Sequence, residues 1–357
     1  IQNENLKKRN RILKKENVKA AGHFPGKRKR GTEADMNTKI IGTGSAVPSR
    51  VLDNAELSTF LDTSDEWIRT RTGIRSRHIA QEGQTASALA AQAAKKAIAD
   101  AGIAAEQIEA IIVATSTPDY IFPSTANLVQ QEIGAERAAC FDLSAACTGF
   151  LYAMSVADAY IKAGMYKKVL VIGAEVMSQV VDWKDRSVCV LFGDGGGAAV
   201  LSKGDGLKYI EINAKGDTDV LKCPRGENTS PFYNHESEHP YLYMNGPEVY
   251  KFAVTSMVRG IKKAIKEAGL TQEDIDWVIP HQANIRIIET AVDKLDIPSE
   301  RYIRTISEYG NTSGGSCAIA LAECAKKHMF KKGDNIVFCA FGSGLTTGSC
   351  VITWDKD

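Results

Sequence analysis

The second half of the chain repeats the order of the first, and this repeat limits the possible folds more than any other feature. Recurrence at an offset of roughly 150 to 170 residues indicates a duplicated structural unit. The matched pairs are IEAIIVATST (108–117) with IDWVIPHQAN (275–284), LSAACTGFLYAMSVADAYIK (143–162) with YGNTSGGSCAIALAECAKK (309–327), KKVLVIGAEV (167–176) with DNIVFCAFGSG (334–344), and GGGAAVLSK (195–203) with TTGSCVITW (346–354).

Short apolar runs alternate with helical patterns within each unit. The runs at 108–115, 167–176 and 195–203 predict buried strands, because they are continuous and rich in Val, Ile and Ala. The stretches 85–102 and 149–164 predict helices that end at glycine. Two similar βαβ-rich halves therefore predict an α/β protein with five layers, α-β-α-β-α.

The first 35 residues differ from the rest in charge. They contain 11 Lys/Arg and 4 Asp/Glu, a net charge of +7, whereas the remainder has 33 Lys/Arg and 39 Asp/Glu, a net charge of −6. Low apolar content predicts a disordered extension, upstream of a natural start at Met36 or added for expression. We therefore predict three parts: the basic extension 1–35, a first half 36–205 and a second half 206–357.

The composition excludes several classes of protein. No apolar run reaches the roughly 18–20 residues of a membrane span, and the start predicts no secretory signal. The basic extension lacks interleaved aromatic residues, so neither nucleic acid nor a membrane is an expected partner. Eight cysteines without a C-x-x-C pair predict reduced thiols in a cytoplasmic protein, and no Cys/His spacing suggests a metal.

Two glycine-rich stretches fail as nucleotide-binding motifs. FGDGGGAAV (192–200) lacks the G-K-[S/T] ending of a phosphate-binding loop and leads into a strand. GTGSAVPS (42–49) lacks the third glycine of a dinucleotide fingerprint. The segment 222–246 has no counterpart in the repeat and little periodicity, so it is predicted to be a long polar loop.

Cys147 lies among small residues in FDLSAACTGF (141–150), between a strand and a helix. Free N–H groups and the helix dipole at such a junction predict a lowered thiol pKa and donors for an oxyanion. A buried structural cysteine at a tight packing point would have the same surroundings. This stretch alone leaves both interpretations open.

His281 and Asn311 occupy comparable positions in the second half. His281 follows the strand-like DWVIP and precedes an amphipathic helix, where α/β folds place ligand sites, although a capping or core histidine fits equally. Asn311 lies in the turn YGNTSGGS, where asparagine is also a common turn or N-cap residue. Because the repeat places Cys147, His281 and Asn311 at the same end of equivalent strands, they are predicted to converge.

From Met36 onward, about nine-tenths of the chain resembles the 3-oxoacyl-[acyl carrier protein] synthase III family of thiolase-fold condensing enzymes. The motifs that carry this resemblance are TSDEWIRTRTGIRSRHIA (63–80), AACTGF, FGDGGGAAV, IPHQANIRI and YGNTSGGS. The resemblance implies transfer of a short acyl group from acyl-CoA to a cysteine, followed by decarboxylative condensation with malonyl-acyl carrier protein. It implies no cofactor, and a homodimer.

The resemblance also implies roles for individual residues. Cys147 would be the nucleophile, His281 and Asn311 would complete the triad, and the backbone N–H groups of Cys147 and Ser343 would form the oxyanion hole. The residues implied to bind coenzyme A are Thr63, Trp67, Arg71, Arg186 and Gly246. Those implied near the acyl pocket are Phe122, which would reach across the dimer interface, Met177 and Phe192. The candidates for binding the acidic carrier protein are Lys251, Arg286 and Lys294, with Arg286 favoured.

Three departures from the family pattern affect the expected shape of the site. Ser343 and Thr347 replace a usual glycine and a common tryptophan, and Gly314 and Gly315 replace an alanine pair. Ser343 would be strained if its φ were positive. The preferred primer stays open among acetyl, propionyl and branched groups, which differ by one or two methylenes.

Related functions on the same fold remain as alternatives. One is an acyltransferase or a polyketide- or quinolone-type condensing enzyme with a different acceptor. A thiolase would need a second catalytic cysteine near the C-terminus, and a hydroxymethylglutaryl-type synthase would need a glutamate just before Cys147. A non-catalytic binding protein is disfavoured by the complete Cys, His and Asn set.

Overall fold

The structure is a computed structural model that describes residues 37–224, 228–230, 232–235 and 240–356. The described residues belong to one compact unit. The basic extension predicted for 1–35 lies outside the described residues, and the predicted boundary at 205/206 stays a prediction.

The first sheet has five strands in the order β1-β7-β6-β4-β5. β4 runs parallel to β5 and β6, whereas β7 is antiparallel to both β6 and β1. The strands predicted at 108–115, 167–176 and 195–203 are present with ends within two residues of those expected. The bounds are β1 Thr38–Ala46, β4 Ala110–Ala114, β5 Ala139–Leu143, β6 Lys168–Glu175 and β7 Gly195–Lys203.

The second sheet repeats this topology in the order β13-β14-β15-β8. β13 is parallel to β14, β15 is antiparallel to β14, and β8 is antiparallel to β15. β8, β15, β14 and β13 therefore correspond to β1, β7, β6 and β4. The counterpart of β5 is reduced to a single bridge between Val278 and Tyr302. The bounds are β8 Leu207–Asp217, β13 Trp277–Pro280, β14 Asn335–Gly342 and β15 Gly344–Thr353.

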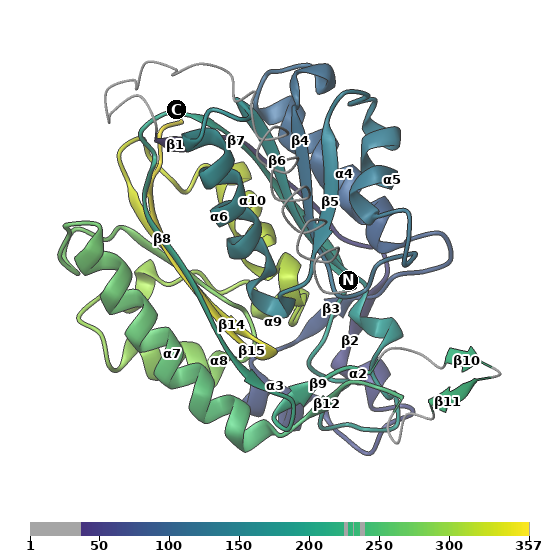
Figure 1. Ribbon diagram of the computed structural model, residues 1–357. Helices are drawn as coiled ribbons and strands as arrows, with labels where there is room; N and C mark the ends of the chain where they lie inside the picture. The colour runs from purple at the N-terminus through teal and green to yellow at the C-terminus, as the bar shows by residue number, and fades with distance from the viewer. Residues whose placement is uncertain (1–36, 225–227, 231, 236–239, 357) are drawn as a thin grey trace, which may run out of the picture. The chain divides into compact units, whose positions relative to one another are not determined.

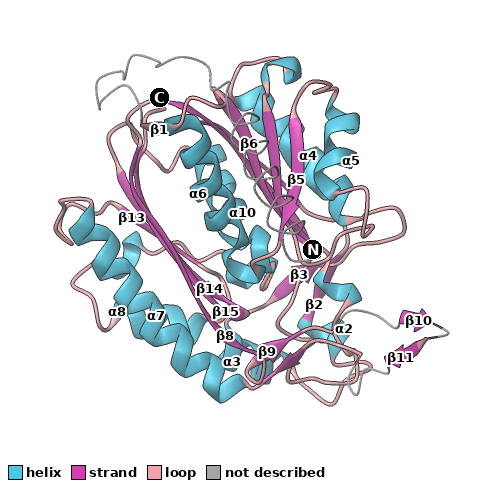
Figure 2. Cartoon of the chain, viewed as in Figure 1, coloured by secondary structure: helices cyan, strands magenta, loops and turns pink. Residues whose placement is uncertain are grey.

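Helices form three layers around the two sheets, as Figures 1 and 2 show. α6 and α10 lie between the sheets, α4 and α5 cover the outer face of the first sheet, and α7 and α8 cover the outer face of the second. This is the five-layered α-β-α-β-α order that the repeat predicts. The bounds are α4 Ala86–Asp100, α5 Thr125–Ile133, α6 Gly149–Lys162, α7 Gly246–Glu267, α8 Ile285–Val292 and α10 Ser316–Lys326.

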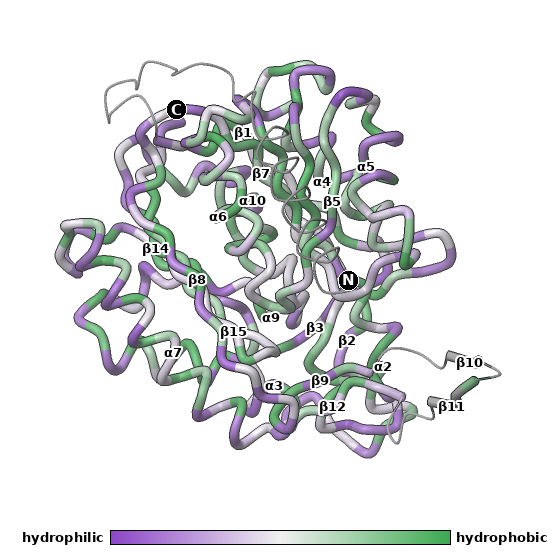
Figure 3. Tube along the Cα trace, in the orientation of Figure 1, coloured by the Kyte–Doolittle hydropathy of each residue, from purple (hydrophilic) through white to green (hydrophobic). Residues whose placement is uncertain are grey.

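The inner and outer helices differ in sequence because they differ in burial. The first nine residues of α10 include only one that is not buried, so this helix is apolar or small on nearly every side. α7 alternates between hydrophilic and hydrophobic residues, as expected of a helix with one solvent-facing side (Figure 3). Gly197 in β7 permits the close approach of α10, because a Cβ there would lie 2.4 Å from the carbonyl carbon of Ala318.

Shorter elements surround the end of the sheets where the predicted site residues lie. The segment 222–246, predicted to be an irregular loop, contains strand pairing: β9 pairs with β12, and β10 pairs with β11. The pairing of β9 with β12 brings the two ends of this segment together. The bounds are β2 Val51–Asp53, α2 Asn54–Leu57, α3 Asp65–Thr72, β3 Ser76–His78, β9 Leu221–Lys222, β10 Asn228–Ser230, β11 Tyr233–His235, β12 Tyr243–Met244 and α9 Ile306–Tyr309.

Five short 3-10 helices complete the description: η2 Ala105–Gln107, η3 Ala146–Thr148, η4 Met177–Gln179, η5 Ser299–Arg301 and η6 Ser313–Gly315. Of these, η3 and η6 are equivalent turns of the repeat, because η3 precedes α6 and η6 precedes α10. Among the residues that could be searched, no helix is long and apolar enough to cross a membrane.

Candidate active site

Cys147 lies in η3, the turn that joins β5 to α6. The preceding residue, Ala146, has a φ of 47°, and Ser313 at the equivalent turn η6 has a φ of 48°. Left-handed backbone at a residue with a Cβ costs about 1 kcal/mol or more, so the surroundings must hold the turn. The Thr148 hydroxyl does so by donating to the carbonyl of Ala145 at 2.7 Å.

His281 follows the last residue of β13, and its backbone N–H donates to the carbonyl of Cys339 at 2.8 Å. Its side chain is 1% exposed and packs edge-on against Phe341, with ring centroids 5.2 Å apart. Within the described part of the chain, neither ring nitrogen has a hydrogen-bond partner. Burial lowers the pKa of His281 to about 3, so the imidazole is neutral and both nitrogens are available to a ligand.

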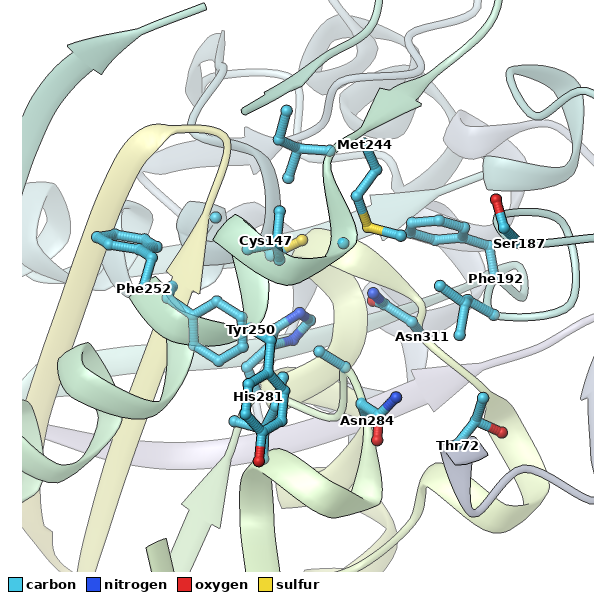
Figure 4. Close-up of a pocket in the computed structure, with 18 of the residues that line it drawn as sticks. Thr72, Cys147, Ser187, Phe192, Met244, Tyr250, Phe252, His281, Asn284 and Asn311 are labelled. Carbon is cyan, nitrogen blue, oxygen red and sulfur yellow. The ribbon is translucent and has the colours of Figure 1, made fainter. Parts of the chain in front are cut away.

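Asn311 is buried just before η6, and one hydrogen bond fixes its backbone while another fixes its side chain. Its N–H donates to the carbonyl of Leu191 at 2.8 Å, and its side-chain oxygen accepts from the N–H of Ser313 at 2.9 Å. Because the amide oxygen is held in this way, the amide NH₂ is the group left to meet a ligand. Figure 4 shows Cys147, His281 and Asn311 grouped around one cavity.

Two cavities meet at Cys147. The first, of about 330 Å³, is lined by Cys147, His281 and Asn311 and extends to Trp67 and Arg71. The second, of about 700 Å³, is lined by Cys147, Met177 and Ser313 among others. Phe192 lines both cavities. The candidate nucleophile therefore lies where the two cavities adjoin.

The pKa of the Cys147 thiol is shifted in the direction opposite to the one that its sequence position predicts. Burial, with a smaller contribution from the charge of Glu175, raises this pKa to about 12. A hydrogen bond from Cys147 Sγ to Ser313 Oγ, 3.6 Å long, opposes the shift only in part. The expectation of a lowered pKa is therefore wrong for the resting site, because lost solvation outweighs the helix terminus.

The end of β14, at Gly342, packs against Cys147. A Cβ on Gly342 would lie 2.9 Å from the backbone nitrogen of Cys147, so this position accommodates only glycine. Ser343 does not have a positive φ, so the backbone strain considered for this substitution is absent. Its hydroxyl donates to the carbonyl of Leu221 at 2.6 Å, and its carbonyl accepts from Thr346 Oγ1 at 2.9 Å.

The other two departures lie in different places. Gly314 is packed against the nucleophile turn, since a Cβ there would lie 3.2 Å from the carbonyl oxygen of Ala146. Thr347 lies outside the linings of both cavities and lines an outer groove of about 490 Å³ beside α7. The tryptophan-to-threonine change therefore affects an outer surface rather than the walls around Cys147.

Trp67 and Arg71 line the far end of the first cavity, and Arg186 lies beside Trp67. The guanidinium of Arg71 lies 4.7 Å from the Trp67 ring centroid, and that of Arg186 lies 5.3 Å from it. Trp67, Arg71 and Gly246 line the cavity, whereas Arg186 lies outside the lining and bonds Asp62. Thr63 lies outside the linings of both cavities, and its buried hydroxyl has no partner among the described residues.

Met177 and Phe192 are buried in the wall of the second cavity, and their role near an acyl group stays a prediction. Phe122 is not in that wall and is 83% exposed. Its neighbour Ile121, 71% exposed, lines the rim of the cavity. Within one copy of the chain, Phe122 is therefore outside the pocket that the resemblance associates with it.

The three basic residues predicted to bind a carrier protein do not lie together. Arg286, at the start of α8, is exposed and donates to the carbonyl of Thr70 at the end of α3. This places it beside the helix that carries Trp67 and Arg71. Lys251 lines the outer groove that contains Thr347, and Lys294 is exposed after the end of α8.

Sequence reasoning missed two residues next to the nucleophile, Ser313 and Glu175. Ser313 contacts Cys147 Sγ, as described above, and Glu175 at the end of β6 is fully buried. The available signal was an acidic residue inside the apolar run KKVLVIGAEV. No group of three or more His, Cys, Asp or Glu that could hold a metal ion was found in the described segments.

Comparison with known families supports the arrangement. Residues 141–218 match the family model described as 3-oxoacyl-[acyl-carrier-protein (ACP)] synthase III, and residues 265–354 match the model of its C-terminal part. A beta-ketoacyl-[acyl-carrier-protein] synthase III of Clostridium acetobutylicum is 48% identical over 326 residues, covering 90% of this chain and 100% of that protein. One from Bacillus anthracis is 45% identical, with the same two coverages.

Solved structures show the same likeness. 3-Oxoacyl-[acyl-carrier-protein] synthase III from Aquifex aeolicus has a TM-score of 0.82 and 45% identity, over 89% of this chain and 100% of that one. The priming β-ketosynthase of the R1128 polyketide pathway has a TM-score of 0.85 and 34% identity, over 93% and 99%. The thiolase-like fold predicted from the sequence is thereby confirmed.

The neutral state of His281 has a measurable consequence for stability. Its pKa is about 3 when folded and about 6.5 when unfolded, so below pH 6.5 the unfolded chain binds more protons and the fold loses stability as pH falls. Between pH 7.5 and 5.0, the free energy of unfolding should fall by about 2 kcal/mol more in the wild type than in His281→Asn. Denaturant unfolding at both pH values measures this difference.

The exposed His328 provides the matched control. His328→Asn should lose stability with pH as the wild type does. Equal pH dependence of the wild type and His281→Asn would contradict a buried, neutral His281.

Proposed function

The chain belongs to the 3-oxoacyl-[acyl-carrier-protein] synthase III family, and on that premise we propose how its residues carry out the reaction. The enzyme is the initiating condensing enzyme of type II fatty-acid synthesis. It transfers a short acyl group from acyl-CoA to an active-site cysteine and condenses it with malonyl-acyl carrier protein. The products are 3-oxoacyl-acyl carrier protein, CoA and CO2. The observation that carries our assignment is the convergence of Cys147, the unpartnered His281 and Asn311 on one cavity.

In the first half-reaction, Cys147 is the nucleophile. Its sulfur attacks the carbonyl carbon of the acyl thioester, and the CoA thiolate leaves. The negative charge on the carbonyl oxygen is stabilised by the backbone N–H groups of Cys147 and Ser343. The close packing of Gly342 against the Cys147 nitrogen supports this role, because it brings the segment that contains Ser343 next to the Cys147 N–H.

In the second half-reaction, His281 and Asn311 stabilise the enolate that forms when malonyl thioester loses CO2. Both can donate a hydrogen bond to the thioester oxygen, His281 from a neutral ring nitrogen and Asn311 from its amide NH₂. The two groups are fixed before substrate arrives, so little reorganisation is needed as charge develops. Stabilisation of charge that appears only in the transition state accelerates the reaction rather than merely tightening binding.

The first cavity is the proposed passage for coenzyme A and for the carrier-protein arm. Trp67, Arg71 and Gly246 line it, and Arg186 lies over the Trp67 ring at its outer end. A nucleotide base can stack on the indole, and the two guanidinium groups can pair with phosphates. Thr63 receives weaker support, since it lies outside the lining.

The second cavity is the proposed acyl pocket, with Met177 and Phe192 in its wall. Tyr120, Ile121 and Phe122 form an exposed apolar segment at its rim, 59%, 71% and 83% exposed respectively. A homodimer that buries this segment would place Phe122 toward the partner's acyl pocket. Burial of large apolar side chains is the main favourable term in such association.

The substrates and location follow from the same reasoning. We assign acyl-CoA and malonyl-acyl carrier protein as substrates and infer that no cofactor takes part, since each step above uses only groups of the chain. The free cysteines of the described residues fit a reducing cytoplasm. The alternative of a polyketide-type or other acceptor has less support, because the relative of that kind is 34% identical against 48% for the synthase.

Variants of the triad should separate the two half-reactions. Cys147→Ala should abolish both acylation and condensation. His281→Ala and Asn311→Ala should retain acylation within about tenfold and lose condensation by about 10²- to 10³-fold, because each removes one donor to the enolate. Intact-protein mass measures acylation, and CO2 release from malonyl-acyl carrier protein measures the second step.

Cys140→Ala is the control, since Cys140 lies on β5 away from both cavities. It should behave as the wild type. Full condensation activity in His281→Ala or Asn311→Ala would rule out the proposed roles.

Carrier-protein binding should depend on Arg286. Carrier proteins of this class are acidic. Arg286 is an exposed cation beside α3, the helix that contributes Trp67 and Arg71 to the first cavity. Arg286→Glu should raise the KM for malonyl-acyl carrier protein about tenfold and weaken its salt dependence, with acylation by acyl-CoA unchanged. Arg137→Glu changes an exposed residue that precedes β5, at the end of this strand away from Cys147. It should alter neither the KM for malonyl-acyl carrier protein nor its salt dependence. Equal KM values for the two variants would contradict the assignment.

The proposed dimer predicts a specific effect of Phe122→Asp. A charge in a buried apolar contact is costly, so the variant should dissociate at concentrations where the wild type is dimeric, as sedimentation velocity would show. Met165→Asp changes an apolar residue that is 58% exposed after α6 and should leave association unchanged. A dimeric Phe122→Asp protein would show that the interface lies elsewhere.

A further inference from the structure

A buried carboxylate lies behind the nucleophile, and the reaction steps described above do not use it. Glu175 is 0% exposed at the end of β6. It accepts hydrogen bonds from Thr117 Oγ1 at 2.6 Å, from the N–H of Ser116 at 3.0 Å and from Thr115 Oγ1 at 3.2 Å. No Lys, Arg or His of the described chain forms an ion pair with it. Burying a carboxylate without a cation is costly, which points to a function beyond packing.

Ser313 connects this carboxylate to the nucleophile. Ser313 Oγ lies 3.4 Å from Glu175 Oε1 and 3.6 Å from Cys147 Sγ. A hydroxyl has one proton and two lone pairs, so Ser313 can accept from the thiol and donate to the carboxylate at the same time. The three side chains come from η3, η6 and β6 and form a continuous chain of hydrogen bonds.

The nucleophile needs a proton acceptor, and His281 does not fit that role. The Cys147 thiol has a pKa of about 12 at rest, so it carries its proton at neutral pH. His281 makes no hydrogen bond to it and, with a pKa of about 3, is a weak base. Burial raises the pKa of Glu175 to about 7, despite the opposing hydrogen bonds. Its carboxylate is the better acceptor near neutral pH.

We propose that Glu175, acting through Ser313, takes up the thiol proton as Cys147 is acylated and returns it when the acyl group leaves. Glu175 is in this sense a positioning residue, since it acts through Ser313 and touches no substrate. The inference rests on the proposed role of Cys147 as the nucleophile.

The protons balance over the full cycle. As the sulfur–carbon bond forms, the S–H bond breaks, its proton passes to Ser313 Oγ, and the Ser313 proton passes to Glu175 Oε1. The CoA thiolate takes a proton from solvent. After condensation the product leaves, and the Cys147 thiolate recovers the stored proton by the reverse route. Solvent therefore supplies one proton per cycle, matching the loss of the malonyl carboxylate as neutral CO2.

Electrostatics favour this arrangement because two anions would otherwise lie close together. At rest Glu175 is ionised and the thiol is neutral, and in the acyl-enzyme both the sulfur and the carboxyl are neutral. Within the described part of the chain, Cys223 at the edge of the second cavity is a further titratable group that interacts with Glu175. The hydrogen-bond donors to the carboxylate are the N–H of Ser116 and the hydroxyls of Thr115, Thr117 and Ser313.

The test compares Glu175→Gln with the wild type over pH 5.5 to 9. The acylation rate with acetyl-CoA, followed by intact-protein mass, should rise to a plateau with a midpoint near pH 7 in the wild type, because Glu175 must be ionised to accept a proton. Glu175→Gln should lose this rise and acylate at least tenfold more slowly at pH 7.5.

A second readout separates proton transfer from a structural defect. In Glu175→Gln the midpoint for alkylation of Cys147 by iodoacetamide should move to lower pH, because the nearby negative charge is gone. Faster alkylation together with slower acylation is the expected signature, whereas simple damage to the site would slow both. An unchanged acylation rate and pH profile would overturn the proposal.

Two further variants complete the design. Ser313→Ala removes the hydroxyl that links Cys147 to Glu175, so it should acylate as slowly as Glu175→Gln. If Glu175→Gln does not fold, Ser313→Ala alone tests the proposal. A wild-type profile in Ser313→Ala would also overturn the proposal. Glu323→Gln is the matched control, because Glu323 accepts from Ser45 Oγ at 2.6 Å far from the nucleophile. Failure of the wild type itself to acquire an acyl group would instead contradict the proposed function.

Discussion

The close contact between the two equivalent turns, η3 and η6, is the constraint on which the site depends. A Cβ at Gly173 would lie 2.1 Å from the carbonyl oxygen of Gly314, and one at Gly314 would lie 3.2 Å from that of Ala146. Only because these positions lack side chains can each half of the duplicated fold bring its turn to the centre. Cys147 from one half then faces Ser313 and Asn311 from the other.

Burial in the centre of the fold sets the charge states of His281, Cys147 and Glu175. Away from water His281 is neutral, the Cys147 thiol keeps its proton, and Glu175 has a pKa near 7. Cys147, His281 and Asn311 are all uncharged at rest, so in the proposed reaction the two donors act on charge that develops later. The five-layered packing therefore determines where these groups lie and which of them carry a proton at rest.

The sequence predicts the layered architecture well because the strands and helices are recorded in local patterns. The repeat indicated the two equivalent halves, and it also indicated that His281 and Asn311 would converge with Cys147; these three residues line one cavity. The direction of the Cys147 pKa shift could not be predicted, because the burial that determines it comes from segments distant in sequence. Glu175 was missed for a similar reason: its partners Thr115, Thr117 and Ser313 belong to two separate loops. The short strand pairs of 222–246 have too few residues for a periodic signal.

The most direct test of the account is to locate the acyl group after incubation with acetyl-CoA. The protein has eight cysteines, and Cys140 and Cys147 lie in the same tryptic peptide, 138–162, so fragment-ion spectra are needed to place the adduct on one of them. We predict one acyl group per chain, on Cys147, and its discharge as 3-oxoacyl-acyl carrier protein after malonyl-acyl carrier protein is added. An adduct on another cysteine, or one that malonyl-acyl carrier protein does not discharge, would contradict Cys147 as the nucleophile of a condensing enzyme.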